Sequence, residues 1–332
     1  MRPRRMHMST INAVAAVTAL SLMIVPAAAR DWPSRPVTMV VPTAPGGAPD
    51  LLGRVVASRL SELLGEPVIV ENVAGAGGMI GAARVARAPA DGYQFLIGTL
   101  GTQAQNQTLY KAPLYNAATD FAPVALLWQV RFILIGRKDL PVDNLQEFIA
   151  YARAHQAAMH YGSGGTGSPS HLACALFNAA VGINVSHVPY RGFGPMIQDL
   201  VAGRIDYLCP SATAAAGYIE SKQVKAIALL SKDRSPLMPT YPSAGEQGLA
   251  DFEDTGWSGM FLPKDTPPPI VHKLNAAVIL TLDTPAVQER FRHSGAEIVA
   301  PDRRSPEYLQ KFVESEITKW AAVIKAADIA IH

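Results

Sequence analysis

Cysteine is scarce in this chain of 332 residues, which contains only Cys174 and Cys209. Two cysteines give no disulfide framework that could be read from their spacing. Cys174 lies in the apolar run 172–177, and Cys209 follows the strand-like segment 205–208. The sequence is therefore compatible with one disulfide in an oxidising compartment or with two buried thiols.

Residue patterns that support catalysis are also lacking. No serine lies in the G-x-S-x-G pattern of many hydrolases. His155 and His160 do not have the i, i+4 spacing of a helical zinc pair. His171 and His187 flank a glycine-rich segment and could reach a cleft, but we expect core or surface positions for both. The sequence thus predicts no catalytic residue, no metal ligand and no cofactor, and hence no enzyme.

The excess of positive charge belongs to the N-terminal segment. Three arginines within the first five residues, an apolar core at 11–26 and an A-x-A site at 27–29 form the pattern of a cleaved signal peptide. The alternative, a membrane anchor, is disfavoured because the apolar core is short for a bilayer span. Removing residues 1–29 takes away three arginines and no acid, so the formal net charge changes from +2 to −1. We therefore expect a periplasmic protein, exported by a signal peptide at 1–29, without a nucleic-acid-binding surface.

The rest of the chain alternates between strand-like and helix-like segments. One series begins with a buried strand at 37–41 and continues to a strand at 93–97. A second series extends from residue 132 to residue 230, and the segment 256–262 resembles a strand that returns to the first domain. This alternation predicts an α/β protein with mainly parallel sheets covered by helices.

Three glycine-rich turns share one design, because each leaves a predicted strand and enters a predicted helix. They lie at 43–50, 162–170 and 189–195, and in the second of them Ser168 and Pro169 suit the N-cap and the first helical position. Glycines allow close approach of the backbone, and helix N-termini bind anions. Ligands sit at the carboxyl ends of strands in open parallel sheets, so turns from two domains would hold one anion in a cleft. The alternative is that these glycines serve only to make tight turns. The presence of three turns of the same design makes this alternative less favoured.

The second turn also spells G-x-G-x-x-G through Gly162, Gly164 and Gly167. A dinucleotide site would need an acidic residue about 20 positions further on, to hold the ribose. Between Ser168 and Gln198 the chain has no aspartate or glutamate. The pattern therefore predicts a carboxylate site and not a dinucleotide site.

Motifs along the whole chain then point to a known family. In chain order these are W-P-S-R-P-V at 32–37, the turn at 42–50, E-N at 71–72, G-A-G-G at 75–78, D-G-Y at 91–93, D-F-A-P-V at 120–124, the segment 161–173, V-P-Y-R-G at 188–192, L-N at 274–275 and G-A-E at 295–297. With these motifs the chain closely resembles the Bug-type solute-binding receptors of tripartite tricarboxylate transporters. The resemblance implies a two-lobed periplasmic-binding-protein fold of the Venus-flytrap, type II-like kind, with two crossovers. Lobe 1 would comprise residues 30–131 and 251–332, and lobe 2 residues 132–250.

The resemblance also implies where a small organic carboxylate would bind. Amides, hydroxyls and waters of the first two turns would hold its oxygens, and residues 101–106 would line the first lobe. The expected ligand-binding residues are Thr43, Ala44, Gly46, Gly47, Asp50, Gly101, Thr102, Asn106, Ser163, Gly164, Thr166, Gly167, Ser168, Tyr190, Arg191 and Asp206. For Asp206 two interpretations stay open, namely contact with a ligand and local hydrogen bonds at the end of a strand.

The chain departs from the family pattern at positions that border the expected cleft. Pro49 replaces a small polar residue and removes a backbone donor. Gln103 and Gln107 replace a usual histidine and proline. Arg191 replaces a frequent lysine, and its planar guanidinium can hold a carboxylate bidentately. The sequence therefore leaves the identity of the carboxylate open.

These observations predict a monomeric periplasmic receptor that closes on a mono-, di- or tricarboxylate and is then recognised by the membrane subunits of a transporter. A first alternative is a receptor that presents its ligand to the ectodomain of a sensor kinase. A second is an exported hydrolase or oxidoreductase that uses the glycine-rich loop as an oxyanion or phosphate cradle.

Overall fold

The computed structural model describes residues 32–250 and 252–326, and the predicted signal peptide lies outside these residues. Among the helices described, none combines the length and the apolar character needed to cross a membrane.

In the described part of the chain, the first sheet has six strands in the order β11-β4-β10-β3-β1-β2. β1 is parallel to both of its neighbours, whereas β10 is antiparallel to β3 and β4, and β11 is antiparallel to β4. The strands are β1 (Val37–Val41), β2 (Val68–Asn72), β3 (Gln94–Thr99), β4 (Phe121–Arg131), β10 (Thr255–Pro263) and β11 (Ala296–Ile298).

The second sheet, formed by residues between 133 and 229 of the described chain, has five strands in the order β7-β6-β8-β5-β9. β6 is parallel to β7 and β8, whereas β5 is antiparallel to β8 and β9. The strands are β5 (Ile133–Arg137), β6 (His160–Ser163), β7 (Ser186–Pro189), β8 (Tyr207–Leu208) and β9 (Val224–Leu229).

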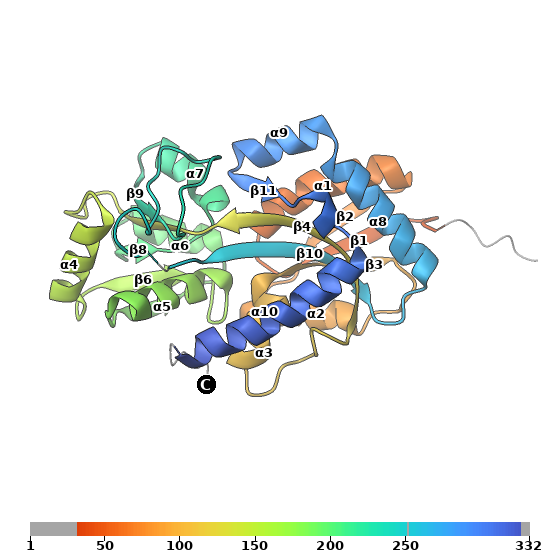
Figure 1. Ribbon diagram of the computed structural model, residues 1–332, viewed down its shortest axis with the longest axis horizontal. Coiled ribbons are helices and arrows are strands. Elements are labelled where there is room, and N and C mark those ends of the chain that lie inside the picture. The colour runs from red at the N-terminus through yellow and green to blue at the C-terminus, as the bar shows by residue number, and fades with distance from the viewer. Residues whose placement is uncertain (1–31, 251, 327–332) are drawn as a thin grey trace, which may run out of the picture. The chain divides into compact units, whose positions relative to one another are not determined.

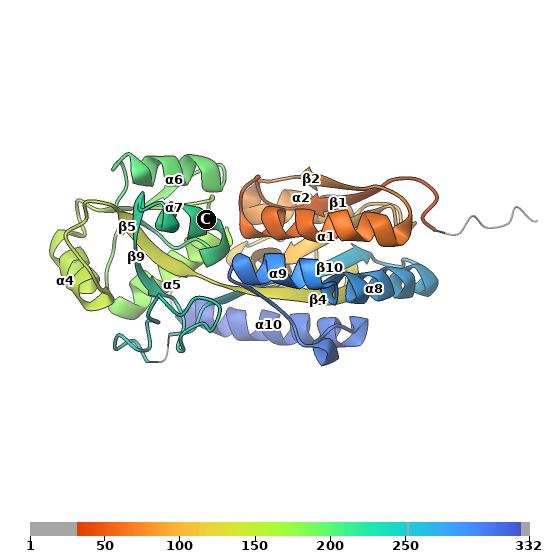
Figure 2. The same ribbon diagram turned by 90° about the horizontal axis from the view of Figure 1, so that it is seen from above.

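Both sheets are thus mixed, and less parallel than the sequence analysis predicted. The difference comes from the strands that carry the chain between the sheets. β4 passes into β5 with only Phe132 between them, and β10 returns antiparallel to β4. Figures 1 and 2 show β4 and β10 side by side from two directions. The strands that enter a sheet from the other lobe run against their neighbours there, as β10 does beside β3 and β5 does beside β8 and β9. β4 was not predicted from the sequence.

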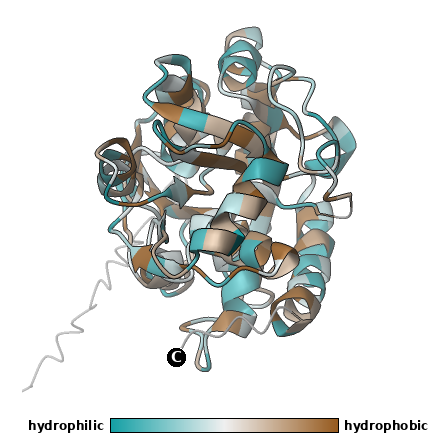
Figure 3. Ribbon diagram, turned by 90° about the vertical axis from the view of Figure 1, so that its left-hand side faces the viewer, coloured by the Kyte–Doolittle hydropathy of each residue, from teal (hydrophilic) through white to brown (hydrophobic). Residues whose placement is uncertain are grey.

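Helices cover both faces of each sheet. They are α1 (Ala48–Leu64), α2 (Met79–Ala86), α3 (Asn106–Leu109), α4 (Leu145–His155), α5 (Pro169–Val181), α6 (Phe193–Val201), α7 (Ala212–Glu220), α8 (Pro268–Leu282), α9 (Pro285–His293) and α10 (Pro306–Ala326), with short turns η1 (Ala76–Gly78), η2 (Gly101–Gln105) and η3 (Pro301–Arg303). Along many helices hydrophobic and hydrophilic residues alternate (Figure 3), as expected when one side of a helix packs on a sheet.

The alternation of side chains along the strands divides the core of each lobe into two layers. In β1, Met39 and Val41 pack with α1, α8 and α9, whereas Val40 packs with α2 and α10. In β5, Ile133 packs with α6 and α7, whereas Leu134 packs with α4 and α5. Successive residues of a strand point to opposite faces, so each sheet is enclosed between two helical layers. This arrangement is the two-lobed α/β fold that the sequence predicted.

α5 shows how local sequence sets the end of a helix beside a loop. The Ser168 hydroxyl accepts a hydrogen bond from the His171 amide, and Pro169 occupies the first helical position. Proline is tolerated there because that amide would have no partner within the helix. Gly182, with φ of 66°, ends the helix in the left-handed region. The predicted N-cap is therefore confirmed.

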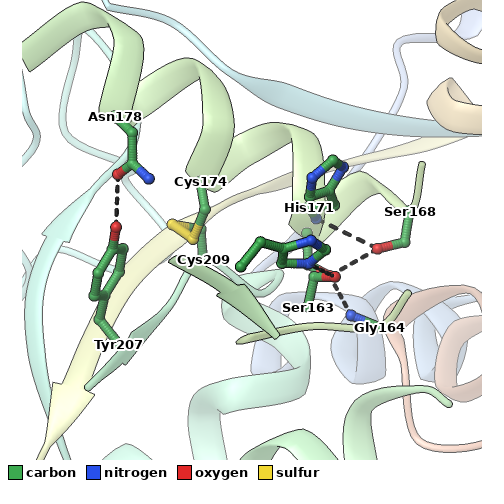
Figure 4. The surroundings of a disulfide bond; sticks show 10 residues. Ser163, Gly164, Ser168, His171, Cys174, Asn178, Tyr207 and Cys209 are labelled. Atoms are coloured by element: carbon green, nitrogen blue, oxygen red, sulfur yellow. Dashed lines mark hydrogen bonds between the residues drawn. A yellow bond between two sulfur atoms is a disulfide. The ribbon is translucent and has the colours of Figure 1, made fainter. Parts of the chain in front are cut away.

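A disulfide joins Cys174 of α5 to Cys209, which follows β8 (Figure 4). Both cysteines are fully buried in the core layer that contains α4 and α5. Close by, the Tyr207 hydroxyl donates to the Asn178 side chain at 2.7 Å. Of the two states that the sequence left open, the structure has the disulfide.

We expect the double substitution Cys174→Ala/Cys209→Ala to lower the free energy of unfolding. The bond closes a loop with a sequence separation of 35 residues, and the entropy that such a loop removes from the unfolded chain is worth roughly 3–4 kcal/mol. Denaturant titration with and without a reductant measures the effect. The reductant should shift the midpoint of the wild type and leave the double variant unchanged, and an unshifted wild type would contradict the assignment.

Candidate ligand-binding site

A cavity of about 720 Å³ lies between loops of the two sheets. Its volume falls within the range of about 300–1,000 Å³ that is typical of small-molecule sites. The first sheet contributes the loops after β1 and β2, and the second contributes those after β6, β7 and β8. All of these loops leave the carboxyl ends of strands, as expected for a ligand site in an α/β protein.

The loop after β1 is held in place from behind by Asp50. This buried carboxylate accepts hydrogen bonds from the Gly46 amide at 2.9 Å and from the side chains of Arg54 and Asn72 at 3.0 Å. Asn72 also donates to the Thr43 carbonyl. Burial by itself would raise the pKa of Asp50, but the hydrogen bonds from Gly46, Asn72 and Arg54 outweigh it and lower the pKa. Asp50 therefore stays ionised and fixes the loop without lining the cavity.

The loop after β6 is stabilised by a network of hydroxyls and imidazoles. The Gly164 amide donates to the Ser170 hydroxyl at 3.0 Å, and the Gly167 amide donates to Nδ1 of His171 at 3.3 Å. Ser163 Oγ accepts from the Gly165 amide at 3.1 Å. Figure 4 shows His171 and Ser168 together beside this loop. These bonds keep the glycines of the loop in one conformation at the cavity wall.

His171 and His187 lie side by side under this loop with their rings tilted by 31°. Their ring centroids lie 4.2 Å apart, and Nε2 of His187 is 2.7 Å from Ser163 Oγ. Burial lowers the pKa of His171 to about 4, and burial together with the neighbouring ring lowers the pKa of His187 to about 4. Both imidazoles are therefore neutral at neutral pH and act in the support of the loop.

The loop after β7 supplies the cation of the cavity. Arg191 is exposed, lines the cavity and forms no ion pair with any carboxylate of the described residues. The neighbouring Tyr190 donates its hydroxyl to Asp199 at 2.8 Å. Burial, with Asp199 as a second cause, raises the pKa of Tyr190 to about 12, so this phenol stays neutral.

Four helices begin at the cavity wall. The N-cap residues of α1, α5, α6 and α7 are Gly47, Ser168, Gly192 and Ser211, and all four line the cavity. The glycine-rich turn that opens α2, at 75–78, lines it as well. Helix N-termini carry unpaired amides and partial positive charge. Among the described residues that line the cavity there is no aspartate or glutamate to neutralise this charge.

Loops of the two lobes meet at glycines beside this cavity. A Cβ atom on Gly77 would lie 2.7 Å from the carbonyl oxygen of Gly167, and one on Gly192 would collide with Cβ of Ala44. The Tyr110 hydroxyl also reaches the Thr166 carbonyl at 3.5 Å. At Gly77 and Gly192 the two lobes are therefore so close that no side chain fits between them.

The structure brings half of the predicted ligand-binding residues to the cavity and places the others behind its wall. Thr43, Ala44, Gly47, Gly164, Thr166, Ser168, Tyr190 and Arg191 line it, whereas Gly46, Asp50, Gly101, Thr102, Asn106, Ser163, Gly167 and Asp206 do not. Several of the second group support wall residues, as Asn106 does by donating to the Gly77 carbonyl at 3.0 Å.

Asp206 requires a correction, because the structure places it away from the cavity. Its carboxylate pairs with Arg137 at 3.0 Å and accepts from the His160 amide at 2.8 Å. It lies just before β8, whereas the cavity lies beyond the opposite end of that strand, at Pro210 and Ser211. Of the two interpretations of Asp206, the structure thus shows the one in which it makes local bonds at the end of a strand.

Besides Thr99 and Leu100 at the C-terminal end of β3, and the residues at the start of α7, sequence reasoning missed two further parts of the wall. The turn at 75–78 carries the same signal as the predicted turns, namely glycines between a strand and a helix, and could have been included. The other part consists of Trp128, Val130 and Phe132 along β4, with residues 256–258 of β10 beside them. No local pattern marks these residues, because only the pairing of two distant strands brings them to the cavity.

Two α/β lobes with a cavity between them, lined by helix N-termini, define a solute-binding protein of the periplasmic type. The periplasmic binding protein BugD has a similar structure, with a TM-score of 0.87 and 38% identity over 90% of this chain and 99% of that chain. MatC from Rhodopseudomonas palustris, solved with bound malate, has a TM-score of 0.84 and 38% identity over 88% and 99% of the two chains. Rpa4515 from R. palustris, solved with adipate, has a TM-score of 0.86 and 37% identity over 90% and 99%.

The model of the tripartite tricarboxylate transporter family receptor, TctC, matches residues 52–329, and the chain belongs to this family. The family resemblance and the two-lobed fold predicted from the sequence are thereby confirmed. Members of this family are periplasmic solute-binding receptors and not enzymes.

The close approach of Gly192 to Ala44 predicts that Gly192→Ala destabilises the protein more than backbone strain alone would. Gly192 has φ of 105°, so alanine is strained there, and its Cβ would also push against the loop after β1. With ψ of −174°, Gly192 lies in a backbone region that is essentially restricted to glycine, where strain costs about 1–3 kcal/mol. Gly203→Ala is a control for alanine at a positive φ, since Gly203 has φ of 72° and open space around a Cβ. Denaturant unfolding should show a larger loss for Gly192→Ala, and equal losses would contradict the interlobe contact.

The buried histidine pair predicts a loss of stability in mild acid. Unfolded histidine takes up a proton near pH 6.5, whereas His171 and His187 in the folded protein resist protonation until about pH 4. Between these values the unfolded chain binds more protons, so the free energy of unfolding falls as the pH falls. We expect the pair to contribute about 1–3 kcal/mol to this loss.

Unfolding titrations between pH 7 and 4 measure this contribution. His187→Gln should make the free energy of unfolding depend less on pH, because only one of the two imidazoles remains. The exposed His272→Gln leaves both rings in place and should retain the full dependence. Identical pH profiles for the two variants would refute the assignment.

Proposed function

We propose that this protein is a periplasmic receptor that captures a small organic carboxylate in the cavity between its lobes for a transporter of the tripartite tricarboxylate type. The observation that carries the proposal is the convergence of helix N-termini on a cavity whose described lining contains an arginine and no acid. Such a cavity attracts a compact anion through backbone amides and one guanidinium. Malate in MatC and adipate in Rpa4515 are ligands of this chemical class.

The proposed contacts divide into two groups. Thr43, Ala44, Gly47, Gly164, Thr166, Ser168, Tyr190 and Arg191 would face the ligand, because they line the cavity. Gly46, Asp50, Gly101, Thr102, Asn106, Ser163 and Gly167 would hold the loops in position, as the bonds of Asp50 and Asn106 illustrate. Asp206 is not included in either group.

Closure of the lobes would link binding to recognition by the transporter. We place the lobe boundaries at 131/132 and 250/251, where β4 passes into β5 and where the chain returns to β10. A ligand that touches loops of both lobes stabilises the closed arrangement, and a partner that binds only this arrangement distinguishes the loaded receptor from the empty one. Export would depend on the signal peptide at 1–29, and the receptor would act as a monomer.

Calorimetry and thermal unfolding with a panel of mono-, di- and tricarboxylates test the proposal. A ligand at 100 times its dissociation constant should stabilise the protein by about 2.7 kcal/mol. Gly164→Val should abolish binding, because the added side chain would extend toward Gly192 and Ser168 at the cavity wall.

Gly217→Val is the control, since Gly217 is exposed on α7 with no atom near its Cβ position. This variant should bind like the wild type. The proposal fails if no carboxylate binds, or if Gly164→Val binds with unchanged affinity while remaining folded.

A further inference from the structure

A buried carboxylate without a hydrogen-bond partner lies where the chain crosses between the lobes. We call the two crossings, at Phe132 and at residues 252–254, the hinge. Asp254 directly precedes β10 and is only 1% exposed. Neither of its carboxylate oxygens has a hydrogen-bond partner among the described residues. A carboxylate in such a place is costly in its charged form, so the group is stable there only when it is protonated.

Backbone hydrogen bonds connect Asp254 to the other crossing of the hinge. Its amide donates to the Leu230 carbonyl at 3.0 Å, and the Leu230 amide donates to the Phe132 carbonyl at 2.8 Å. Phe132 separates β4 from β5, and Leu230 directly follows β9. The two crossings therefore meet at Leu230, and Asp254 lies at the place about which the lobes would turn.

Both lobes contribute to the enclosure of this segment. Phe252, two residues before Asp254, packs against the core layer of α2 and α10 in the first lobe and against that of α4 and α5 in the second. Its ring centroid lies 6.2 Å from that of Phe177 on α5. A rotation of one lobe away from the other would separate these layers and admit water to the segment between them.

The charged groups around Asp254 come from both sides of the hinge. Those that act on its carboxylate are Glu253 in the same segment and Glu316 and Lys319 on α10. Arg131 at the end of β4 is paired with Glu253 at 2.5 Å. On the side of the second lobe, Lys232 is exposed and contacts Glu253 through its amide. None of the described cations donates a hydrogen bond to Asp254.

Glu316 shows how a buried carboxylate nearby is satisfied. It accepts hydrogen bonds from the indoles of Trp257 and Trp320 at 2.9 and 3.0 Å and from the Lys319 ammonium at 3.3 Å. Asp254 receives no such bond from the described residues. Burial and the charge of Glu253 raise the pKa of Asp254 to about 7 against the opposing effect of Lys319, and Glu316 adds to the rise. In this arrangement Asp254 is therefore protonated below neutral pH, whereas a solvated aspartate ionises near pH 4.

We propose that Asp254 is a proton switch of the hinge, buried and protonated when the lobes are closed, and solvated and ionised when they are open. The proposal deepens the proposed function and rests on it, because closure on a carboxylate would then take up a proton. Between about pH 4 and pH 7 the closed arrangement binds more protons than the open one, so acid favours closure. Well above pH 7 the side chain is ionised in both arrangements, and the affinity no longer depends on its titration.

Calorimetry in two buffers of different ionisation enthalpy counts the protons that the protein takes up when malate or adipate binds. Asp254 should contribute about 0.9 proton at pH 6 and about 0.1 proton at pH 8. The affinity of the wild type should accordingly fall about tenfold from pH 6 to pH 8. Asp254→Asn is neutral at every pH, so it should lose this proton uptake and bind more tightly than the wild type at pH 8.

Asp233→Asn is the matched control, because it makes the same chemical change at an exposed position of the neighbouring segment. This variant should retain the proton uptake of the wild type. If Asp254→Asn does not fold, Asp254→Ala takes its place, since a smaller apolar side chain fits the same site and needs no partner.

Small-angle X-ray scattering of the ligand-free protein tests the hinge without a probe. The wild type should be more compact at pH 5.5 than at pH 8, and Asp254→Asn should have one radius of gyration at both pH values. Where malate or adipate binds, equal proton uptake by the wild type and Asp254→Asn overturns the switch and leaves the proposed function intact. If no carboxylate binds, the proposed function fails, and an unchanged radius of gyration of the wild type then overturns the switch as well.

Discussion

The unpaired amides of helix N-termini are the physical constraint on which the rest of this structure depends. The first amides of α1, α5, α6 and α7 have no acceptor within their own helices, and all four N-caps border one cavity. The loops before these helices are rich in glycine, which lets backbone from the two lobes approach, as Gly77 does to Gly167. Such a surface favours an anion, so the architecture of strands followed by helices supports the proposed negative charge of the ligand.

Several groups behind the cavity wall hold its loops in place. Asp50 accepts hydrogen bonds from three donors and does not line the cavity, so a negative charge stabilises the loop without entering the site. The neutral pair of His171 and His187 supports the loop after β6 from below. The disulfide ties α5 to the segment that leads into α7, and thus connects two of the five helix starts at the wall. Preorganisation of this kind reduces the entropy that binding would otherwise cost.

Much of the local structure could be predicted from the sequence, and the limits of that prediction have clear causes. The turns after β1, β6 and β7 were recognised because glycine, proline and capping residues act through neighbours in the chain. β4 was missed, although it is the longest strand of those described, and with it the part of the cavity wall that this strand contributes. The antiparallel direction of β10 and β5 was not foreseen either, since strands that connect lobes have no local signature of direction. The sequence could not decide between a disulfide and two free thiols, because this depends on how close the fold brings Cys174 of α5 to Cys209 after β8.

The sequence by itself determined the α/β class, the family motifs and the presence of anion-binding turns, because these depend on short segments and on the geometry of single residues. Only the tertiary structure decided which turns share a cavity, and it showed that Asp206 pairs with Arg137 outside that cavity. It also brought β4 and β10 to the cavity wall, since Val130 and Gly256 become neighbours only when two strands far apart in the chain pair in register. The glycine-rich turns at the wall therefore come from local sequence, whereas the wall that β4 and β10 contribute comes from long-range packing.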